Sequence, residues 1–471
     1  MALVLYNTRS RREEVFEPLT PGKISIYVCG ITVYDRCHVG HARSLVFFDT
    51  LVRYLRWRGY QVEFVRNITD IDDKIINRAR ERGESWKDLA DRFIAEMHRD
   101  VAALGCVQPD IEPRATEHIG EMIELIAELE RHGLAYAVGD GDVYFAVTGF
   151  ARYGALSGRN LEEMQAGARV DVDERKRSPM DFALWKAAKP GEPWWPSPWG
   201  NGRPGWHLEC SAMSMKYLGR VFDIHGGGED LIFPHHENEL AQSCGAYDTD
   251  FVRYWIHHAF VRIDQEKMSK SLGNAFAIED VLKEVEAEGL RLHLLSVHYR
   301  SPLDFSAAGI AESTKALVRA YETLARADEA GVPRHEYGFD SPQAAPLVEA
   351  MDADFNTTRG VGILFEAARD ANRALDAGDL ARGAEAVGVM RAAGLGLGLL
   401  MRSPAEFLAG YNARGASQAG LAAADIERLI GERREARAAK NFKRADELRA
   451  ELLAQGIVLE DGPGGTSWRR A

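Results

Sequence analysis

Three features that would place a protein in a membrane or outside the cell are missing from this sequence. No apolar stretch reaches the length of a transmembrane helix. The amino-terminal segment, Met-Ala-Leu-Val-Leu-Tyr-Asn, has neither the charged leader nor the cleavage pattern of a secretory signal. The 5 cysteines are odd in number and far apart, which argues against a disulfide framework and for free thiols, a metal site, or both. We therefore expect a cytoplasmic protein with no membrane partner.

An overall excess of positive charge is also missing, because the formal net charge is −13. The charge is unevenly distributed, since residues 425–471 hold ten Lys and Arg against nine Asp and Glu. This end of the chain would fit against a phosphate backbone, and it would equally fit a solvated helix with ion pairs between successive turns. No coiled-coil seam is visible, so we expect a monomer. The 471 residues are enough for two to four domains.

The segment Cys29–His41 is the candidate centre of the molecule. It follows a β-branched, strand-like run and precedes a helical pattern at residues 42–55. His38 and His41 therefore lie on a strand-to-helix turn, where backbone N–H groups and the helix dipole favour a phosphate. Gly40 removes the side chain that would keep a ligand away from the backbone. A His-x-Gly-His tetrad is also compatible with ordinary surface polarity.

Residues 20–115 alternate between strand and helix patterns, which predicts a βαβ unit and hence a parallel sheet. Residues 61–66 form the second expected strand. Ligands of such sheets sit at the carboxyl ends of the strands, so Cys29, the two histidines and Asn67–Asp70 are expected to gather there. The acidic run Asp70–Asp73 is more simply the N-cap and first turn of the helix that follows.

Residues 116–205 have the pattern of an insertion. A helix is expected over residues 118–131, and the Gly139–Gly141 turn between two apolar runs predicts a β-hairpin. The Pro-, Trp- and Gly-rich segment 190–200 is not expected to form regular structure. The parallel-sheet pattern resumes at Gly205–Met213.

Two loops are candidates for contacts with a nucleotide. The strand predicted at residues 220–225 ends at three glycines, including Gly226 and Gly227, which would let an adenosine approach the backbone or would simply make a flexible turn. Lys267 and Lys270 belong to the run Lys-Met-Ser-Lys-Ser-Leu-Gly-Asn, a cationic loop suited to a polyphosphate. Generic loops of Lys and Ser are common.

A metal site is the third candidate. His235 and Glu239 are four residues apart, so a helix would place them on one face. That spacing presents a nitrogen and an oxygen to one metal, and Cys29 and Cys210 would supply sulfurs for a zinc site. The competing interpretation is a pair of buried cysteines and a surface contact between His and Glu.

The pattern from Ala277 onward is almost entirely helical, which predicts a bundle. The expected helices cover residues 278–288, 290–299, 311–330, 346–377 and 380–401. A linker is expected at residues 410–417. The small end domain after it is expected to contain helices at 425–439 and 443–455 and short strands at 457–460 and 468–470.

Several segments together resemble the cysteinyl-tRNA synthetases, a family of class I aminoacyl-tRNA synthetases. The segments are residues 29–41, 205–213, 225–239 and 456–463, together with the pentad at 267–271. The resemblance runs over essentially the whole chain. Two positions depart from the family pattern, since Val39 stands where Ile is usual and Glu229 where a small polar residue is common.

The resemblance implies an α/β fold with a Rossmann-like parallel-sheet catalytic domain at residues 1–115 and 206–276. A connective insertion would occupy residues 116–205. A helical stem-contact and tRNA-binding bundle at 277–408 and a small anticodon-binding domain at 418–471 would follow. The implied partners are tRNA(Cys), L-cysteine, and ATP with Mg²⁺.

The resemblance also implies that Cys29, Cys210, His235 and Glu239 bind one zinc ion per subunit. A hydrophobic pocket rejects a near-isostere poorly, and serine differs from cysteine only by oxygen for sulfur. A soft metal that binds the substrate as a thiolate would separate the two by bond chemistry. An editing domain would then be unnecessary.

The implied reaction has two steps. The carboxylate of cysteine attacks the α-phosphate of ATP to give cysteinyl-adenylate and pyrophosphate, and the acyl group then passes to the terminal ribose of the tRNA. The implied roles are transition-state stabilisation by His38 and His41, pyrophosphate binding by Lys267 and Lys270, further ATP contacts from Gly40, Gly226 and Gly227, and a cysteine pocket of Thr69, Trp206, His225 and Asp230.

Three alternatives can be told apart by particular features. A related ligase that passes cysteine to a small amine would not need residues 418–471. A non-catalytic tRNA-binding relative would be expected to lack some of the histidines and lysines of the two ATP motifs, which are all present. A synthetase for another amino acid, such as methionine, would not depend on Cys29. The sequence assigns no role to Cys37, Cys106 or Cys244.

Overall fold

The computed structural model describes residues 2–160, 174–263, 266–268, 275–418, 423–439, 441–462 and 465–470. The chain divides into two compact units. The first contains Met1–Thr314, Glu336–Ala367 and Gly388–Leu399, and the second contains Lys315–His335, Ala368–Val387 and Leu400–Ala471. None of the helices in the described ranges combines the length and the apolar character needed to span a bilayer.

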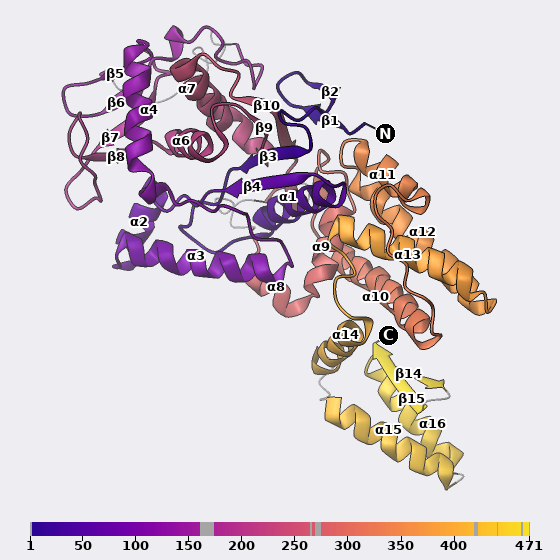
Figure 1. Cartoon of the computed structure of the whole chain (residues 1–471). Helices are drawn as coiled ribbons and strands as arrows, with labels where there is room; N and C mark the ends of the chain where they lie inside the picture. Colours follow the sequence, from indigo (N-terminus) through magenta and orange to yellow (C-terminus); the bar gives the residue numbers. More distant parts are fainter. Residues whose placement is uncertain are drawn as a thin grey trace. The chain divides into compact units, whose positions relative to one another are not determined.

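A parallel sheet of four strands forms the centre of the first unit (Figure 1). Its order is β10 (Val252–His258), β9 (Phe222–Gly228), β3 (Lys23–Val28) and β4 (Gln61–Arg66), and every neighbouring pair is parallel. Helix α1 (Val39–Trp57) joins β3 to β4, as the predicted βαβ unit requires. The sequence-based prediction of a parallel α/β sheet is therefore confirmed.

Helices cover the sheet on both faces (Figure 1). Helix α1 packs against β4 and β9, whereas α6 (Trp206–Leu218) packs against β3 and α7 (Glu237–Tyr247). Because both faces are covered, all of β9 and most of β3 are buried. The other helices of this part of the unit are α2 (Asp73–Arg82), α3 (Trp86–Ala103), α8 (Ile278–Glu284) and α9 (Ala287–Leu295).

The acidic residues before α2 have two different structural roles. Asp72 is the N-cap of α2 and accepts a hydrogen bond from the Lys74 N–H at 2.8 Å, which confirms the predicted cap. Asp70 does not take part in it. Its carboxylate accepts hydrogen bonds from the backbone N–H and hydroxyl of Thr116, at 2.9 and 2.6 Å, and so ties the start of the insertion to the end of β4.

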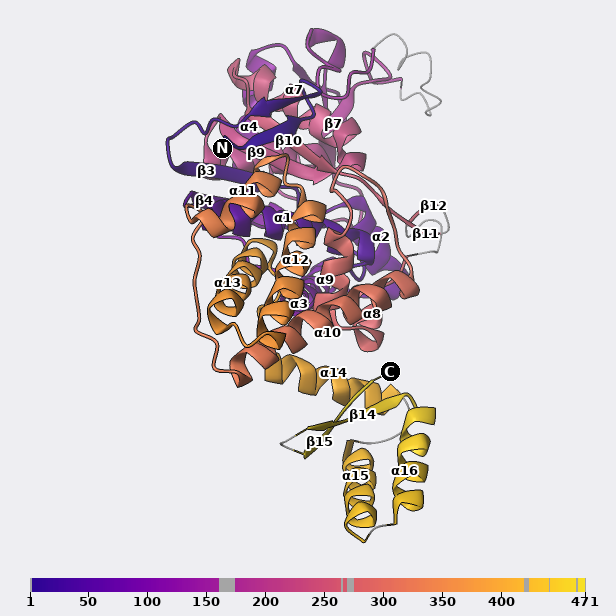
Figure 2. The ribbon, with the colours of Figure 1, turned by 90° about the vertical axis from the view of Figure 1, so that its right-hand side faces the viewer.

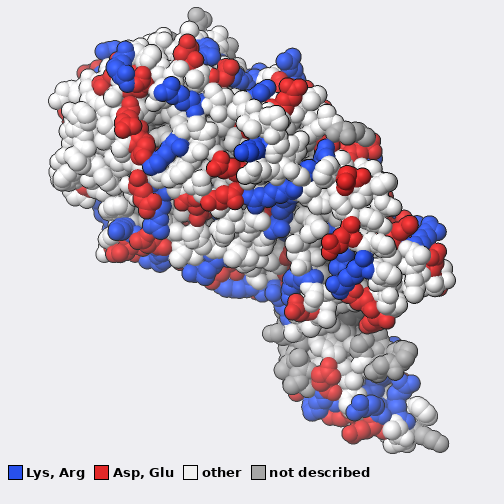
Figure 3. Space-filling view, viewed as in Figure 1, with Lys and Arg blue, Asp and Glu red and all other residues white. Residues whose placement is uncertain are grey.

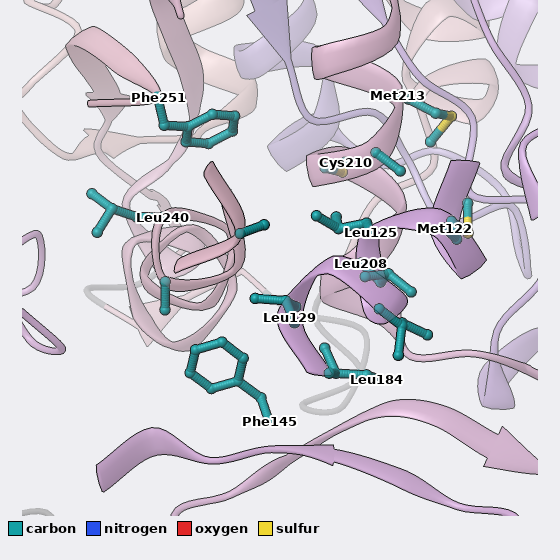
Figure 4. Packing of buried hydrophobic residues seen from close by; sticks show 14 of the residues in the cluster. Met122, Leu125, Leu129, Phe145, Leu184, Leu208, Cys210, Met213, Leu240 and Phe251 are labelled. Atoms are coloured by element: carbon teal, nitrogen blue, oxygen red, sulfur yellow. The ribbon is translucent and has the colours of Figure 1, made fainter. Parts of the chain in front are cut away.

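The insertion contains helix α4 (Ile119–Arg131) and an antiparallel sheet in the order β5-β6-β7-β8. The sheet is built from β5 (Ala135–Ala137), β6 (Val143–Phe145), β7 (Phe182–Ala187) and β8 (Gly202–Pro204). The pairing of β5 with β6 confirms the predicted hairpin. Side chains of α4, α6 and α7 share one apolar core with the inner face of this sheet, and Cys210 lies within it (Figure 4).

Three short pairings complete the strands of the first unit. Strands β1 (Val4–Asn7) and β2 (Arg12–Val15) form an antiparallel pair. Strand β11 (Val261–Ile263) pairs with β12 (Glu266–Lys267) and β13 (Leu303–Asp304). The chain leaves the parallel sheet after His258, so β10 and β11 are separate strands in different sheets.

The carboxyl-terminal half is helical, as predicted, but two boundaries differ from the prediction. The elements are α10 (Ala307–Glu329), α11 (Ala345–Asp352), α12 (Thr357–Asp376), α13 (Leu380–Leu397) and α14 (Pro404–Gln418). The single helix predicted at 346–377 is wrong, because Asp354 and Phe355 adopt left-handed backbone angles (φ 55° and 49°) between α11 and α12. The buried Asp354 carboxylate is held there by the Tyr6 N–H at 2.8 Å and the Tyr299 hydroxyl at 2.6 Å.

The linker predicted at residues 410–417 is also wrong, because these residues continue α14. One face of that helix is apolar enough to be buried within the second unit. Phe407 has no exposed surface, and its ring stacks on Tyr321 of α10 with centroids 3.9 Å apart. Burial of this aromatic face holds a helix that its Gly, Asn and Ser content alone does not predict.

The end of the chain forms two helices and a β-hairpin, as predicted (Figure 2). They are α15 (Ala423–Ala438), α16 (Phe442–Ala454), β14 (Ile457–Gly462) and β15 (Gly465–Arg470). A separate small core of aliphatic side chains joins them: Ile426, Leu429, Ile430, Leu448, Leu452, Ile457 and Leu459. On the face shown in Figure 3, Lys and Arg side chains of this region are interspersed with Asp and Glu.

Candidate active site and metal centre

The candidate site lies where the direction of the parallel sheet changes. The chain runs from β3 outward to β4 on one side, and from β9 outward to β10 on the other. Ligands of open α/β sheets bind at the carboxyl ends of the strands at such a switch point. Cys29 follows β3 directly, and its N–H donates to the carbonyl of Gly226 in β9 at 3.2 Å. Cys29 therefore lies at the switch point.

Four side chains, including that of Cys29, converge at this point. The Cys29 and Cys210 sulfurs are 3.5 Å apart, and Cys29 Sγ is 3.3 Å from Glu239 Oε1. His235 Nε2 is 3.0 Å from the same carboxylate oxygen. One potential ligand atom from each of these residues lies within 4.8 Å of the others. The structure thus brings together all four residues that the sequence proposed as metal ligands. They come from the end of β3, from α6, from the helical turn Ile232–His236 and from α7.

The donor set and its spacing fit a tetrahedral metal ion. Bonds of about 2.0–2.3 Å in a tetrahedron place neighbouring ligand atoms about 3.3–3.8 Å apart. The two distances made by the Cys29 sulfur fall in this range, and the His235–Glu239 distance is a little shorter. Two thiols, an imidazole and a carboxylate are donors that Zn²⁺ accepts. The buried Cys/His/Glu cluster is therefore suited to a metal.

A second group of donors overlaps the first and consists of Cys29, His225, His236 and Glu239. His225 Nε2 is 2.8 Å from Glu239 Oε2, the carboxylate oxygen that faces away from Cys29. His236 is held from behind, because its Nδ1 is 2.7 Å from His257 Nε2. These contacts are those of residues that orient a ligand, so we favour the set with two sulfurs.

His235 is oriented in the same way from its other ring nitrogen. His207 Nδ1 is 2.9 Å from His235 Nδ1, which leaves His235 Nε2 facing the cluster. The indole of Trp206 stacks on the His235 ring with centroids 4.2 Å apart. Trp206 was predicted to line the cysteine pocket, and it also fixes the plane of this imidazole.

Burial and close contacts set the charges of the cluster. Burial raises the pKa of Glu239, but His225 and His235 hold it well below its ordinary value. Burial lowers the pKa of His207 and of His236, so both imidazoles are neutral. Within the cysteine pair, Cys29 donates to Cys210, which makes Cys210 the first of the two to lose its proton and brings its pKa to about 6 despite burial. Burial lowers the pKa of His235, but Glu239 and Cys210 raise it to about 10. The cluster therefore offers a carboxylate, a thiolate and a His235 imidazole that would release its proton on binding a metal.

The histidine turn at the start of α1 has a defined internal geometry. The rings of His38 and His41 stack with centroids 3.8 Å apart, and the His38 N–H donates to His41 Nδ1 at 3.1 Å. Because Nδ1 of His41 accepts, Nε2 carries the proton of the neutral ring. A Cβ on Gly40 would lie 2.8 Å from the His38 ring, so Gly40 makes room for this stacking.

The glycines of β9 have a structural role that the sequence did not show. The strand extends through Gly228, so Gly226 and Gly227 lie inside it and do not form a turn. A Cβ on Gly226 would lie 2.3 Å from the Phe48 ring, and one on Gly227 would lie 2.9 Å from His236. Their lack of a side chain thus allows α1 and the histidine cluster to approach the sheet.

The predicted cysteine-pocket residues occupy different positions. Thr69 is buried, and its hydroxyl donates to the buried Glu209 at 2.8 Å. His225 faces Glu239, as described above, and Asp230 is exposed just after β9. Burial raises the pKa of Glu209 well above its ordinary value, although the hydrogen bond from Thr69 acts to lower it.

The lysine loop lies largely outside the described residues. Lys270 belongs to the undescribed segment 269–274, and only the backbone of Lys267 is described, in β12. The chain becomes described again at Ala275, and Phe276 then accepts a hydrogen bond from Val39 N–H at 3.0 Å. The carboxyl-terminal end of the loop is thereby fixed beside the histidine turn.

Sequence reasoning missed the residues behind the cluster. His236, His257 and His207 orient the potential ligands. Asn67, which was expected at this edge of the sheet, accepts the Gly30 N–H at 2.8 Å through Oδ1. The signal available was the density of histidines, including the pairs at 235–236 and 257–258. Nothing in the spacing showed which of them faces which ligand.

Comparison with known proteins places this site in a family. Residues 15–315 match the model of the catalytic domain of class I (C) tRNA synthetases. Residues 347–401 match the DALR domain, and residues 420–469 match the anticodon-binding domain of cysteinyl-tRNA ligases. With its parallel sheet and switch-point cluster, the chain is a class I aminoacyl-tRNA synthetase by fold.

Two similar proteins of known name are both cysteine--tRNA ligases. A cysteine--tRNA ligase of Methylobacillus flagellatus is 55% identical over 469 residues, with 100% of both chains covered. One of Geobacter sulfurreducens is 55% identical over 481 residues, again with 100% of both chains covered. The chain belongs to the cysteine--tRNA ligase family.

Solved structures support the fold. A methionyl-tRNA synthetase of Mycobacterium tuberculosis in complex with methionyl-adenylate has a TM-score of 0.60 at 18% identity, covering 82% of this chain and 93% of that chain. A LeuRS of Agrobacterium radiobacter K84, in a ternary complex with tRNA, has a TM-score of 0.59 at 12% identity, covering 81% and 85%. At such low identity the likeness concerns the fold alone.

Proposed function

We propose that this protein attaches L-cysteine to tRNA(Cys) in an ATP-dependent reaction that passes through cysteinyl-adenylate. The observation that carries the proposal is the cluster of Cys29, Cys210, His235 and Glu239 at the switch point of the sheet. It supplies soft donors in a chain that belongs to the cysteine--tRNA ligase family. The selection of cysteine and the binding of a metal would thus depend on the same four side chains.

The four residues would hold one zinc ion per subunit, with Thr69, Trp206, His225 and Asp230 around the amino acid. When bound, zinc supplies a soft Lewis acid that favours a thiol substrate over a hydroxyl. His225 keeps Glu239 oriented and Trp206 keeps His235 oriented. These contacts support selection of cysteine over serine without an editing domain.

In the first step a carboxylate oxygen of cysteine forms a bond to the α-phosphorus of ATP, and the bond from that phosphorus to the pyrophosphate oxygen breaks. A carboxylate is already nucleophilic, so no side chain need act as a base. His38 and His41 would donate hydrogen bonds to the phosphate as its charge rises in the transition state. The proton on His41 Nε2, fixed by the His38 N–H, supports this role.

Other contacts to ATP complete the proposal. Mg²⁺ would accompany the nucleotide, and Lys267 and Lys270 would hold the departing pyrophosphate. Gly40 lets the nucleotide approach the start of α1, where backbone N–H groups favour a phosphate. Gly226 and Gly227 would border the adenosine from β9.

Transfer to tRNA needs the rest of the chain. We assign residues 1–115 and 206–276 to catalysis and 116–205 to the connective insertion. Residues 277–408 would contact the tRNA stem, and 418–471 would read the anticodon region. The match of residues 420–469 to an anticodon-binding domain supports this division. Cytoplasmic action as a monomer is part of the same proposal.

Transfer of cysteine to a small amine is the alternative, and one observation disfavours it. Such a ligase has no use for an anticodon-binding domain, yet the last 50 residues match one and fold around their own core. The tRNA is therefore the acceptor that the whole chain supports best.

The first experiment measures metal content and ATP–pyrophosphate exchange on one purified sample, with serine as the control substrate. We expect about one zinc per chain and exchange that depends on cysteine but not on serine. Exchange without bound metal would contradict the zinc-based selection. Bound zinc without exchange would contradict the synthetase activity.

A matched pair of variants tests the ligands. Cys210→Ser removes a sulfur of the cluster, so it should lower zinc content and weaken cysteine-dependent exchange. Cys244→Ser changes a buried cysteine of α7 in the same apolar core but outside the metal cluster. It should retain zinc, and equal zinc loss in both variants would contradict the assignment.

A further inference from the structure

Arg36 lies two residues before His38 and reaches across to helix α8. Its Nη1 is 2.8 Å from Asp280 Oδ2 and its Nη2 is 3.2 Å from Asp280 Oδ1, so the guanidinium holds this carboxylate through both nitrogens. Nη2 also donates to Glu279. Lys283 donates to Asp280 at 2.8 Å from the next turn of α8. Arg36 is thus the centre of a small ionic network on the face of α8 that meets the histidine turn.

The backbones of the two segments are joined at the same place. Val39 N–H donates to the Phe276 carbonyl at 3.0 Å, and Ile278 N–H donates to the Cys37 carbonyl at 2.9 Å. His38 and Ala277 form an isolated antiparallel bridge between these bonds. A ladder of two hydrogen bonds is short, so its position depends on the side chains that flank it.

Apolar packing gives this junction little support on one side. A cavity of about 280 Å³ borders Arg36, Glu96, Arg99, Asp100, Glu279 and Lys283. Its lining is mostly charged, and Ala103 and Leu282 are its apolar members. Cys37, Val39 and Ile278 are buried at the junction. On the side of the cavity, the fit of the histidine turn against α8 depends on the ionic network.

We propose that Arg36 is a positioning residue for adenylate formation. By holding Glu279 and Asp280 it keeps the histidine turn in register with α8, and so keeps His38 and His41 where the α-phosphate reacts. This inference rests on the proposed synthetase function. Arg36 acts through the two histidines and makes no contact with the reacting atoms.

If Arg36 positions the histidines, its loss should slow adenylate formation without lowering the stability of the fold. An exposed ionic network contributes little to folding, so its loss should hardly change the melting temperature. Misplacement of a catalytic group by about 1 Å can lower a rate about 100-fold. We therefore expect a clear fall in kcat and almost no change in the melting temperature.

The test compares Arg36→Ala and Arg36→Lys in ATP–pyrophosphate exchange, with the melting temperature measured in parallel. Arg36→Ala should lower kcat by about 10-fold and leave the KM for cysteine within about 2-fold. Arg36→Lys keeps the charge but not the two-pronged geometry, so it should recover part of the loss. Arg92→Ala is the matched control, because Arg92 binds Glu84 through both nitrogens, at 2.7 and 2.9 Å, on the surface of α3.

A double-mutant cycle isolates the contact. Asp280→Ala should reduce kcat as Arg36→Ala does, and the double variant should be no slower than the single ones. Additive losses, unchanged kcat in Arg36→Ala, or a fall in melting temperature that accounts for the lost activity would each overturn the positioning role. Absence of cysteine-dependent exchange in the unmodified protein would instead refute the proposed function.

Discussion

The buried carboxyl group of Asp100 should make the stability of the protein depend on pH. This residue lies on α3 with 7% of its surface exposed, and the described part of the chain offers its carboxylate no hydrogen bond. Burial, together with the charge of Glu279, raises its pKa from 3.8 to about 6. The carboxylate is therefore destabilising when ionised, and Asp100→Asn removes that charge while it keeps the shape.

The sign follows from the direction of the shift. A carboxyl that is more easily protonated in the folded state than in the unfolded state favours folding at low pH and opposes it once ionised. The penalty appears as the pH rises from about 4 to 6 and is complete above that range. A shift from 3.8 to about 6 corresponds to about 3 kcal/mol at 1.36 kcal/mol per unit. Because Asp100 borders a solvent-accessible cavity, we expect about 1 kcal/mol.

The assay is thermal unfolding of Asp100→Asn and the unmodified protein at pH 4.5 and pH 8. The variant should melt about 2 °C higher at pH 8, and the difference should largely vanish at pH 4.5. Asp88→Asn is the control, because Asp88 is an exposed carboxylate of the same helix. It should give the same small difference at both pH values. A gain for Asp100→Asn that did not depend on pH would refute the electrostatic reasoning.

Three further changes should separate the parts of the molecule. Lys270→Ala should slow adenylate formation by about 100-fold or more with unchanged zinc content, and equal rates in rapid-quench measurements would exclude the assigned role. Gly226→Ala forces a Cβ to within 2.3 Å of the Phe48 ring, so chemical unfolding should show a loss of about 1–3 kcal/mol, whereas an unchanged midpoint would show that α1 can shift. Truncation after Gln418 should weaken tRNA binding in filter assays more than it affects exchange with cysteine. If both fall together, the end domain has a structural role.

Much of the fold could be predicted because local patterns and long-range structure agree. Strands β3 and β4 are rich in β-branched and aromatic residues, which are typical of strands. The hairpin of β5 and β6 follows from the Gly-Asp-Gly turn between two apolar runs. These features depend on neighbours within a few residues, so the sequence carries them directly.

The missed boundaries have causes that act over long distances. The break between α11 and α12 contains neither Gly nor Pro, and it is stabilised by Tyr6 and Tyr299, whose contacts with Asp354 span the chain. Helix α14 contains glycines, and the stacking of Phe407 on Tyr321 compensates for them. No window of ten or twenty residues contains this information.

The candidate site was predictable in its members but not in its arrangement. The spacing of His235 and Glu239 placed both on one helix face, with Cys29 and Cys210 proposed to supply sulfurs, and the resemblance to a family implied the same four residues. A strand buried on both faces has no alternation of apolar and polar residues that would show on which face a side chain lies. The sequence therefore could not predict that His225 faces Glu239. The same limit applies to the histidines behind the cluster.

The distance along the chain between the potential metal ligands has a consequence during synthesis. Cys29 and Glu239 are separated by 210 residues, and the sulfur of the first meets the carboxylate of the second only when β9 and α7 are both in place. At about 5–20 residues per second, Cys29 emerges from the ribosome roughly 10–40 s before Glu239. During that interval its thiol has neither Cys210 nor the buried histidines beside it. A nascent chain therefore passes through a period in which this cysteine is a free, oxidisable thiol, and the cluster of four potential ligands is complete only after more than half of the protein has been made.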